Sequence, residues 1–245
     1  MKLSDRPYSH DKLVNMIPKK IHYCWFGGKP LPKLALKCKS SWEKFFPDYE
    51  IKEWNESNFD VDSIPYTKYC YEHRQWAYLS DYVRLDVVEK EGGLYFDTDV
   101  EVVKRPTELL SSSHAYFGWE TPEFINTGLG FAAEPHHPAV KAMLSMYDGL
   151  VVNGKYTYDR MQGCPQLNTK ALVPFGLEKN GSKQDVCEAV ILPVDYMCPF
   201  KDATGELTKT ENTFSIHWFS KSPHGEWAAW KIRLFTRPLH RWLLK

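Results

Sequence analysis

The sequence lacks an excess of charge of either sign. Its 245 residues include 31 Lys and Arg against 31 Asp and Glu, so the formal net charge is zero. Proteins that bind nucleic acid neutralise its phosphates with a surplus of basic residues, and this chain has no such surplus. We therefore expect no nucleic-acid partner. The chain also contains no internal repeat and no low-complexity segment.

Motifs for metal-binding thiols, export and membrane insertion are missing as well. No two cysteines form a Cys-x-x-Cys motif, so we expect neither a zinc knuckle nor a dithiol redox site. The stretch MKLSDRPYSHDKLVNM has no apolar core of a signal peptide. No segment approaches the roughly 18 consecutive apolar residues of a spanning helix. These absences predict a cytoplasmic protein with reduced thiols.

The hydrophobic pattern that is present predicts an α/β fold. Residues 19–28 and 48–57 are strand candidates, and residues 32–46 between them place Leu34, Cys38 and Trp42 near one helical face. A strand, a helix and a strand within about 40 residues indicate a right-handed βαβ unit and a largely parallel sheet.

The clearest helix covers residues 73–93. Ala77, Leu85 and Val88 lie on or beside one stripe, and Gly92 and Gly93 supply the C-terminal stop. We expect a strand directly afterwards at 94–103, shorter strands at 115–120, 128–134 and 213–220, and a helix at 137–151. Residues from about 157 to 213 mix loops with short elements.

Two aspartates interrupt the apolar strand at 94–103. Positions i and i+2 of a strand face the same side, so Asp97 and Asp99 present two carboxylates to one target. Like charges this close raise each other's pKa unless a cation neutralises them, and oxygen ligands without a thiolate favour Mg²⁺ or Mn²⁺. We expect the strand to end at this pair, because ligands bind outside the carboxyl ends of strands in open α/β sheets.

Other interpretations of the pair are available. Asp-x-Asp is a common tripeptide and can simply occupy an exposed strand end. An EF-hand requires Gly at the sixth loop position, where this chain has Val102. Phosphohydrolases that form an aspartyl-phosphate carry the pair near the chain start, with Thr or Val two residues on. Here the pair is in mid-chain and Glu101 occupies that place.

The helix before the pair carries a second set of polar candidates. Asp81 and Arg84 are three residues apart and share a helical face, and Ser80 adjoins them. On spacing alone, the favoured interpretation is an ordinary surface ion pair worth about 0.2–0.5 kcal/mol.

Three segments carry a family resemblance: IPKKIHYCWFGG at 17–28, LSDYVRLDVVEKEGGLYFDTDVEV at 79–102 and SIHWFSKS at 215–222. The middle one is the specific part, with Ser-Asp-x-x-Arg followed by Gly-Gly-x-Tyr-x-Asp-x-Asp. Together they resemble glycosyltransferase family 32, the DXD-containing sugar transferases that include bacterial capsule and lipopolysaccharide enzymes. The resemblance implies a GT-A fold, which is a Rossmann-like, mostly parallel sheet flanked by helices. It also implies a nucleotide-sugar donor with Mn²⁺ or Mg²⁺.

The resemblance implies roles for the central residues. Ser80, Asp81 and Arg84 would bind the donor sugar, with Arg84 also near the diphosphate. Asp97 would lie by the ribose and the sugar and contribute to the metal site, and Asp99 would bind the metal directly. Asp81, Arg84, Asp97 and Asp99 are thus the expected catalytic set.

More distant residues complete the implied site. Trp25 would stack on the nucleotide base, and Asn126 would line the donor-sugar pocket. His217 is a candidate metal ligand, with an ordinary strand histidine as the alternative. Ser222 keeps a serine of the family's donor-closing segment, but Pro223 replaces its final tryptophan, which puts closure over the donor in doubt. The segment at 161–172 resembles another family segment, with Cys164 inserted, and is placed near a sugar.

The expected function follows from this chemistry. Sugar transfer from a nucleoside diphosphate builds negative charge on the leaving phosphate, which a divalent ion held by carboxylates stabilises. We expect a metal-dependent, retaining hexosyltransferase that uses a UDP- or GDP-sugar and a glycan or lipid-linked glycan acceptor. The alternatives are an inactive transferase-like protein that binds carbohydrate or nucleotide-sugar, and a Mg²⁺ phosphohydrolase.

Domain organisation is expected to be simple. An N-terminal arm covers 1–16, a single GT-A domain covers 17–225, and a basic amphipathic helix covers 226–245. A basic helix that bears tryptophans can lie on an anionic membrane surface, here the inner face of the plasma membrane. The alternative is a helix docked on the core. Its basic residues are Lys231, Arg233, Arg237, Arg241 and Lys245.

Overall fold

The computed structural model describes residues 17–158 and 162–220. The expected arm at 1–16, the expected helix at 226–245, and Ser222 with Pro223 lie outside the described residues. The division into three segments therefore stays a prediction.

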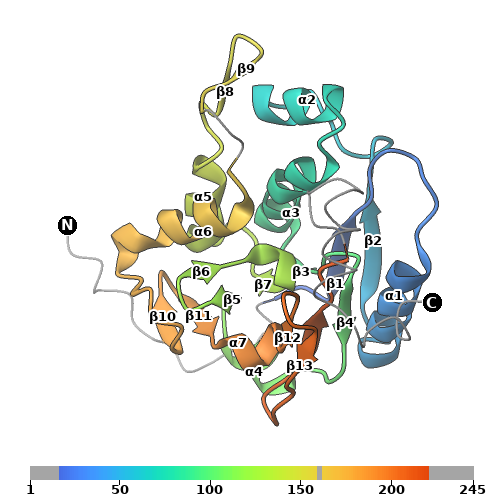
Figure 1. Ribbon diagram of the computed structural model, residues 1–245, viewed down its shortest axis with the longest axis vertical. Coiled ribbons are helices and arrows are strands. Elements are labelled where there is room, and N and C mark those ends of the chain that lie inside the picture. Colours follow the sequence, from blue (N-terminus) through green and yellow to red (C-terminus); the bar gives the residue numbers. More distant parts are fainter. Residues whose placement is uncertain (1–16, 159–161, 221–245) are drawn as a thin grey trace.

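A mixed eight-stranded sheet forms the centre of the molecule (Figure 1). Its strands are β1 (Lys20–Cys24), β2 (Glu50–Trp54), β3 (Gly93–Tyr95), β5 (Ala115–Thr121), β6 (Phe124–Ile125), β7 (Phe131–Ala133), β10 (Gln184–Val186) and β11 (Ala189–Leu192). The order is β10-β11-β5-β7-β3-β1-β2, and β6 pairs with β5. Strands β2, β1, β3, β5 and β11 run in one direction, and β6, β7 and β10 run opposite. The predicted α/β class with a mostly parallel sheet is confirmed.

Helices cover both faces of the sheet. The helices are α1 (Lys33–Phe45), α2 (Pro65–Glu72), α3 (Trp76–Glu91), α5 (Pro138–Ser145), α6 (Cys164–Leu172) and the short α7 (Val194–Met197). The strand residues alternate between two buried clusters, as a period of two requires. Tyr95 and Phe117 pack with α3, α5 and α6, whereas Leu94 and Tyr116 pack on the other face with α1 and α7.

The regular elements of the N-terminal half agree with the sequence pattern. Strands β1 and β2 are adjacent and parallel, with α1 between them in the chain. The predicted helix at 73–93 is α3, in which Leu85 and Val88 are buried, but Ala77 is exposed, contrary to its expected place on the stripe. The predicted helix at 137–151 is the shorter α5.

The expected strand at 94–103 is interrupted. Strand β3 ends at Tyr95, and β4 (Val100–Val102) begins after the acidic pair. A turn joins them, in which the Val100 N–H donates to the Asp97 carbonyl at 3.0 Å. Asp97 and Asp99 therefore lie in a turn, and the strand rule that placed both on one face does not apply. The expectation that the strand ends at the pair is correct.

Strand β4 is held on two sides. It pairs antiparallel with β14 (Ser215–His217), the predicted late strand, in the register His217 to Val100. The Trp42 indole of α1 donates to the Val100 carbonyl at 2.8 Å, and the Val102 N–H donates to the Ser41 hydroxyl at 2.9 Å. Asp99 is thus the last residue of the turn, directly before a strand that is hydrogen-bonded on both sides.

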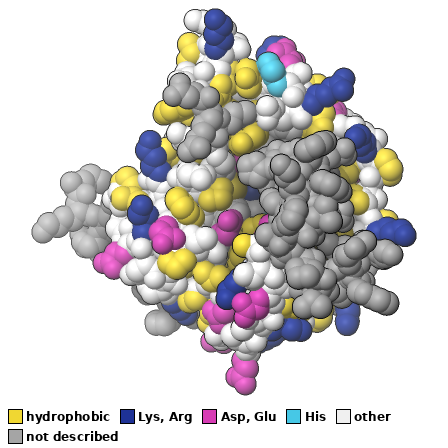
Figure 2. Space-filling model, in the orientation of Figure 1, with side chains coloured by type: hydrophobic (Ala, Val, Ile, Leu, Met, Phe, Trp, Pro, Cys, Tyr) yellow, Lys and Arg dark blue, Asp and Glu magenta, His cyan; other side chains and the backbone are white. Residues whose placement is uncertain are grey.

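The remaining elements are short. They are α4 (Thr107–Ser112), the hairpin of β8 (Val151–Val152) and β9 (Lys155–Tyr156), the hairpin of β12 (Phe200–Lys201) and β13 (Glu206–Leu207), and the 3-10 turns η1 (Thr127–Leu129) and η2 (Val173–Phe175). The six cysteines are free thiols. Among the described residues, no helix combines the length and apolarity needed to cross a membrane. On the described part of the face in Figure 2, basic and acidic side chains are interspersed rather than gathered in one basic patch.

Candidate functional site

A cavity of about 1390 Å³ lies at the edge of the sheet where β1, β3 and β5 end. This is the edge at which open α/β sheets bind ligands. The structure brings eight of the predicted site residues to its wall, and the ninth, Ser222, lies outside the described residues. The eight are Trp25, Ser80, Asp81, Arg84, Asp97, Asp99, Asn126 and His217.

One wall of the cavity is an ion network formed by Asp81, Arg84 and Asp97, which we call the arginine cluster. Arg84 Nη2 lies 3.0 Å from Asp81 Oδ1 and 3.0 Å from Asp97 Oδ1. The Arg84 side chain is only 3% exposed, so the surface ion pair that the spacing alone favoured is ruled out. Tyr95 donates its hydroxyl to Asp97 Oδ1 at 2.8 Å. The network joins α3 to the end of β3.

Burial dominates the electrostatics of the arginine cluster. It raises the pKa of Asp81 to about 6, although the neighbouring Arg84 charge opposes the change. Burial likewise raises the pKa of the Asp97 carboxyl against the same guanidinium. The buried Asp81 and the partly buried Asp97 therefore share one permanent positive charge, and the site retains an attraction for a further cation.

A glycine allows the arginine cluster to form against η1. A Cβ atom on Gly128 would lie 2.6 Å from Asp97 Oδ2, 2.9 Å from Asn126 Oδ1 and 3.1 Å from Arg84 Nη1. A real Cβ does not tolerate the shortest of these separations. The absence of a side chain at this position lets the backbone approach the three polar groups closely.

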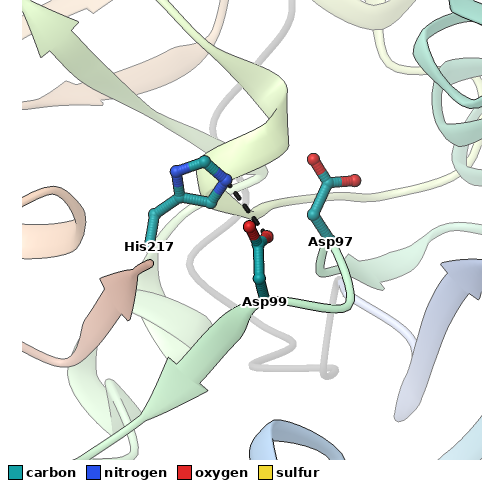
Figure 3. A group of neighbouring side chains, drawn as sticks. All are labelled: Asp97, Asp99 and His217. Atoms are coloured by element: carbon teal, nitrogen blue, oxygen red, sulfur yellow. Dashed lines mark ion pairs between the residues drawn. The ribbon is translucent and has the colours of Figure 1, made fainter. Parts of the chain in front are cut away.

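On the adjacent wall, Asp99 and His217 form what we call the histidine pair (Figure 3). Asp99 Oδ1 lies 3.2 Å from His217 Nε2, and the Ser220 N–H donates to Asp99 Oδ2 at 2.6 Å. Burial alone would raise the pKa of Asp99, but the His217 charge and the Ser220 N–H hold it below its usual range. Burial disfavours the imidazolium, yet the Asp99 carboxylate raises the pKa of His217 above its usual value.

Asp97, Asp99 and His217 together have the composition of a divalent metal site. Each offers one ligand atom, and these atoms lie within 4.8 Å of one another. His217 Nδ1 is buried and has no hydrogen-bond partner among the described residues. Two carboxylates and an imidazole suit Mn²⁺, and the carboxylates alone suit Mg²⁺. The donor set and the excess of buried negative charge fit such an ion.

The other predicted residues are arranged as follows. Trp25 is half-buried and donates its indole N–H to the Lys29 carbonyl at 2.5 Å. The Ser80 hydroxyl donates to the Ala77 carbonyl at 2.8 Å, within its own helix. Asn126 is buried beside the arginine cluster rather than in an exposed turn. Trp25 and Ser80 both line the cavity, and the Ser80 carbonyl accepts a hydrogen bond from Arg84 Nε at 3.1 Å.

Asn126 is fixed by residues that the sequence did not identify as partners. Its Oδ1 accepts from the Gly128 N–H at 2.6 Å and from the Cys164 thiol at 3.0 Å, and its Nδ2 donates to Glu120 Oε2. Arg84 Nη1 in turn donates to the Cys164 sulfur at 3.4 Å. The sequence indicates Cys164 only as an insertion in a segment that is placed near a sugar. Glu120 carries no sequence signal beyond its place near a strand end.

Comparison with known proteins gives a match over part of the chain. Residues 32–116 match the family described as "Glycosyltransferase sugar-binding region containing DXD motif". This range contains the whole arginine cluster and Asp99. Proteins of this DXD family use a divalent metal and a nucleotide-sugar donor in general. Among curated proteins, none matches the chain.

A solved glycosyltransferase structure shows the same fold. The PaToxG glycosyltransferase aligns with a TM-score of 0.53 and 19% identity over 64% of this chain and 69% of its own. A glycosyltransferase involved in glycosylation of the major capsid of PBCV-1 aligns at 0.48, with 13% identity over 83% of this chain and 95% of its own. Galactosyltransferase LgtC, solved with donor and acceptor sugar analogues, aligns at 0.46, with 17% identity over 89% and 94%. The last two scores are too low to support an argument.

The fold and the family match point to the same class of protein. The sheet order, the helices on both faces and the PaToxG likeness give the fold of the GT-A glycosyltransferases. The family match covers the motif residues that line the cavity. Family 32 itself, and a capsular or lipopolysaccharide type, stay predictions. Fold and family match together support a sugar transferase in general.

Proposed function

We propose that the protein is a metal-dependent, retaining glycosyltransferase that moves a hexose from a UDP- or GDP-linked donor to a glycan or glycolipid of the cell surface. The observation that carries the proposal is the meeting of Asp97, Asp99 and His217 with the arginine cluster in one cavity at the ligand edge of the sheet.

Different residues would bind different parts of the nucleotide-sugar donor. Trp25 offers a half-buried ring on which a nucleotide base can stack. Asp97, Asp99 and His217 would hold Mn²⁺ or Mg²⁺, which neutralises the charge that develops on the leaving diphosphate. Arg84, positioned by Asp81 and Asp97, supplies a fixed positive charge and hydrogen-bond donors to oxygens of the donor. Asp81 and Asn126 line the part of the cavity assigned to the sugar.

Retention of the anomeric configuration is proposed to follow a front-face path. The bond from the anomeric carbon to the phosphate oxygen breaks, a bond to the acceptor oxygen forms on the same face, and the acceptor proton passes to the leaving phosphate. The arginine cluster keeps Asp97 paired with Arg84 and Tyr95, which disfavours it as a nucleophile. Mass-spectrometric detection of a covalent glycosyl-enzyme would contradict this path.

The Asp99→Ala variant tests the proposal. Removal of this carboxylate is expected to lower Mn²⁺-dependent hydrolysis of UDP- or GDP-hexose by roughly 100-fold or more, because the leaving phosphate loses its electrostatic support. Asp185→Ala, at an exposed position of β10 away from the cavity, is the matched control. Circular dichroism checks that both variants are folded.

Three results would contradict the proposal. Undiminished hydrolysis by Asp99→Ala would remove the metal role of the carboxylate. Binding of a nucleotide-sugar by the wild type without any turnover would favour an inactive transferase-like protein. Release of phosphate from a phosphomonoester, without hydrolysis of nucleotide-sugars, would favour a phosphohydrolase.

A further inference from the structure

We propose that Glu120 is the centre of an acceptor subsite, in which its carboxylate accepts a hydrogen bond from the hydroxyl of the hexose that receives the transferred sugar. This inference rests on the proposed function and adds the acceptor's place and chemical class to it.

The order of strands along the sheet places Glu120 at one end of the cavity. Strands β1, β3 and β5 run in the same direction, so their carboxyl ends lie at one edge. Trp25 follows β1, Asp97 follows β3, and Glu120 is the penultimate residue of β5. In the sheet, β1 and β5 lie on opposite sides of β3. A donor with its base at Trp25 and its diphosphate near Asp97 and Asp99 therefore directs its sugar toward Glu120.

Glu120 has one carboxylate oxygen available for a ligand. Its Oε2 accepts from Asn126 Nδ2, which fixes the side chain. Within residues 17–158 and 162–220, Oε1 makes no hydrogen bond, and the half-buried side chain lines the cavity. Glu120 is also separate from the group of possible metal ligands. A fixed carboxylate oxygen that accepts hydrogen bonds suits a sugar hydroxyl.

Helix α6 brings two more polar side chains to the same end. Gln166 and Lys170 are one turn apart, and both line the cavity. The helix is tied to this end of the sheet, because the Ile125 N–H of β6 donates to Thr169 Oγ1 at 2.9 Å, and β6 pairs with β5. Carboxylate, amide and ammonium groups together match the many donors and acceptors of a hexose.

The size of the cavity leaves space for a second ligand. Sites for single small molecules enclose roughly 300–1,000 Å³. The cavity here encloses about 1390 Å³, and its polar lining extends from Asp99 to Glu120 and Lys170. A donor and an acceptor hexose account for this volume better than a donor alone.

The Glu120→Gln variant separates acceptor binding from donor binding. Glutamine keeps an oxygen for Asn126 Nδ2 but replaces the free oxygen with a hydrogen-bond donor and removes the charge. Two rates are measured with Mn²⁺ and UDP- or GDP-hexose: hydrolysis of the donor by water, and transfer to a panel of methyl hexosides. We expect kcat/KM for the methyl hexoside to fall roughly 10- to 100-fold, the effect of losing a hydrogen bond to a charged group. Hydrolysis and the donor KM should not change.

Glu123→Gln is the matched control, because Glu123 is exposed in the turn after β5 and does not line the cavity. It should leave both rates unchanged. Gln166→Ala, at an exposed position of α6, provides a second test that does not depend on the folding of Glu120→Gln. It should lower transfer but not hydrolysis.

The outcomes distinguish this inference from the proposed function. Wild-type protein that hydrolyses no UDP- or GDP-hexose overturns both. Wild-type protein that hydrolyses a donor but transfers to no methyl hexoside overturns the hexose subsite alone. An equal fall of hydrolysis and transfer in Glu120→Gln, or no fall in either, also overturns it, since the effect would then be structural or absent.

Discussion

The arginine cluster and the histidine pair border the same cavity but hold buried charge in different ways. In the arginine cluster, a guanidinium that cannot lose its proton bridges Asp81 and Asp97. In the histidine pair, the partner of Asp99 is an imidazole, which becomes neutral when its proton leaves. The positive charge of Arg84 is permanent. The proton on His217 can leave, and a metal ion can take its place as the positive charge beside Asp99. A divalent ion therefore fits beside Asp99 and His217, whereas Arg84 keeps its own charge beside Asp81 and Asp97.

The largest expected effect breaks the permanent network. Arg84→Ala leaves the buried Asp81 and the partly buried Asp97 without their cation, and we expect the free energy of unfolding to fall by about 3–5 kcal/mol. Urea denaturation followed by tryptophan fluorescence measures the change. Lys68→Ala, which removes only solvent-exposed pairs with Asp62 and Glu72, is the control and should be far milder. Equal losses in the two variants would remove the distinction between buried and surface pairs.

The next largest expected effect is the stabilisation of the native protein by a divalent cation at the histidine pair. Mn²⁺ at about 100 times its dissociation constant should stabilise the native protein by about 2.7 kcal/mol, and EDTA should reverse the gain. His217→Ala should lose most of this stabilisation because one of the ligand atoms is gone. His73→Ala, at an exposed position, should keep it. Full stabilisation of His217→Ala by Mn²⁺ would show that the imidazole is not a ligand.

Local patterns were sufficient for much of the fold, but the arginine cluster was predicted from the family resemblance, because the spacing of Asp81 and Arg84 alone favoured a surface ion pair. Helix α3 is buried on most of its faces and has little amphipathic periodicity, but its glycine stop and the apolar strand that follows it could be located from the sequence. At Gly92, φ is +63°, and a Cβ there would lie 2.6 Å from Pro135 Cδ. The glycine stop is thus a real requirement of the chain path.

Contacts between distant segments could not be predicted from one sequence. The link from Arg84 to Cys164 spans 80 residues, and Cys164 opens a helix, α6, whose buried Asn168 and Thr169 obscure its apolar face. Strand β5 showed its apolar run, but nothing local indicated that Glu120 would accept from Asn126. Such contacts depend on the order of the strands in the sheet. The sequence of one short strand does not reveal which strands lie beside it.

A smaller effect on stability comes from His22, a second buried histidine that can be compared with His217. His22 Nε2 donates to the Gly92 carbonyl at 2.8 Å, and its Nδ1 accepts from the Trp54 indole at 3.1 Å, so the neutral ring is fully bonded. Burial lowers the pKa of His22, whereas the Asp99 carboxylate raises the pKa of His217 in spite of its burial. The unfolded chain then binds the extra proton, and stability should fall as pH drops below about 6.5, by at most about 1.4 kcal/mol per pH unit.

Urea midpoints between pH 7.5 and 5.5 measure this loss. His22→Gln cannot take up the proton and should be less stable at neutral pH but less sensitive to acid. The buried carboxylates of the arginine cluster act in the opposite direction, since a raised acid pKa stabilises the protonated fold. The difference between wild type and His22→Gln isolates the histidine. An identical pH dependence in the two proteins would contradict the role of His22.

The smallest expected effect tests whether the hydrogen bonds of the Cys164 thiol contribute to the stability of the arginine cluster. The Cys164 thiol donates to Asn126 Oδ1 and accepts from Arg84 Nη1, and burial raises its pKa well above the usual range, so it stays a thiol. Cys164→Ala should lose about 1 kcal/mol of stability, because one donor of the guanidinium loses its partner. Cys164→Ser keeps a donor and an acceptor at this position and should lose less. Equal losses would mean that the sulfur only fills space, and the permanent network would then end at Arg84.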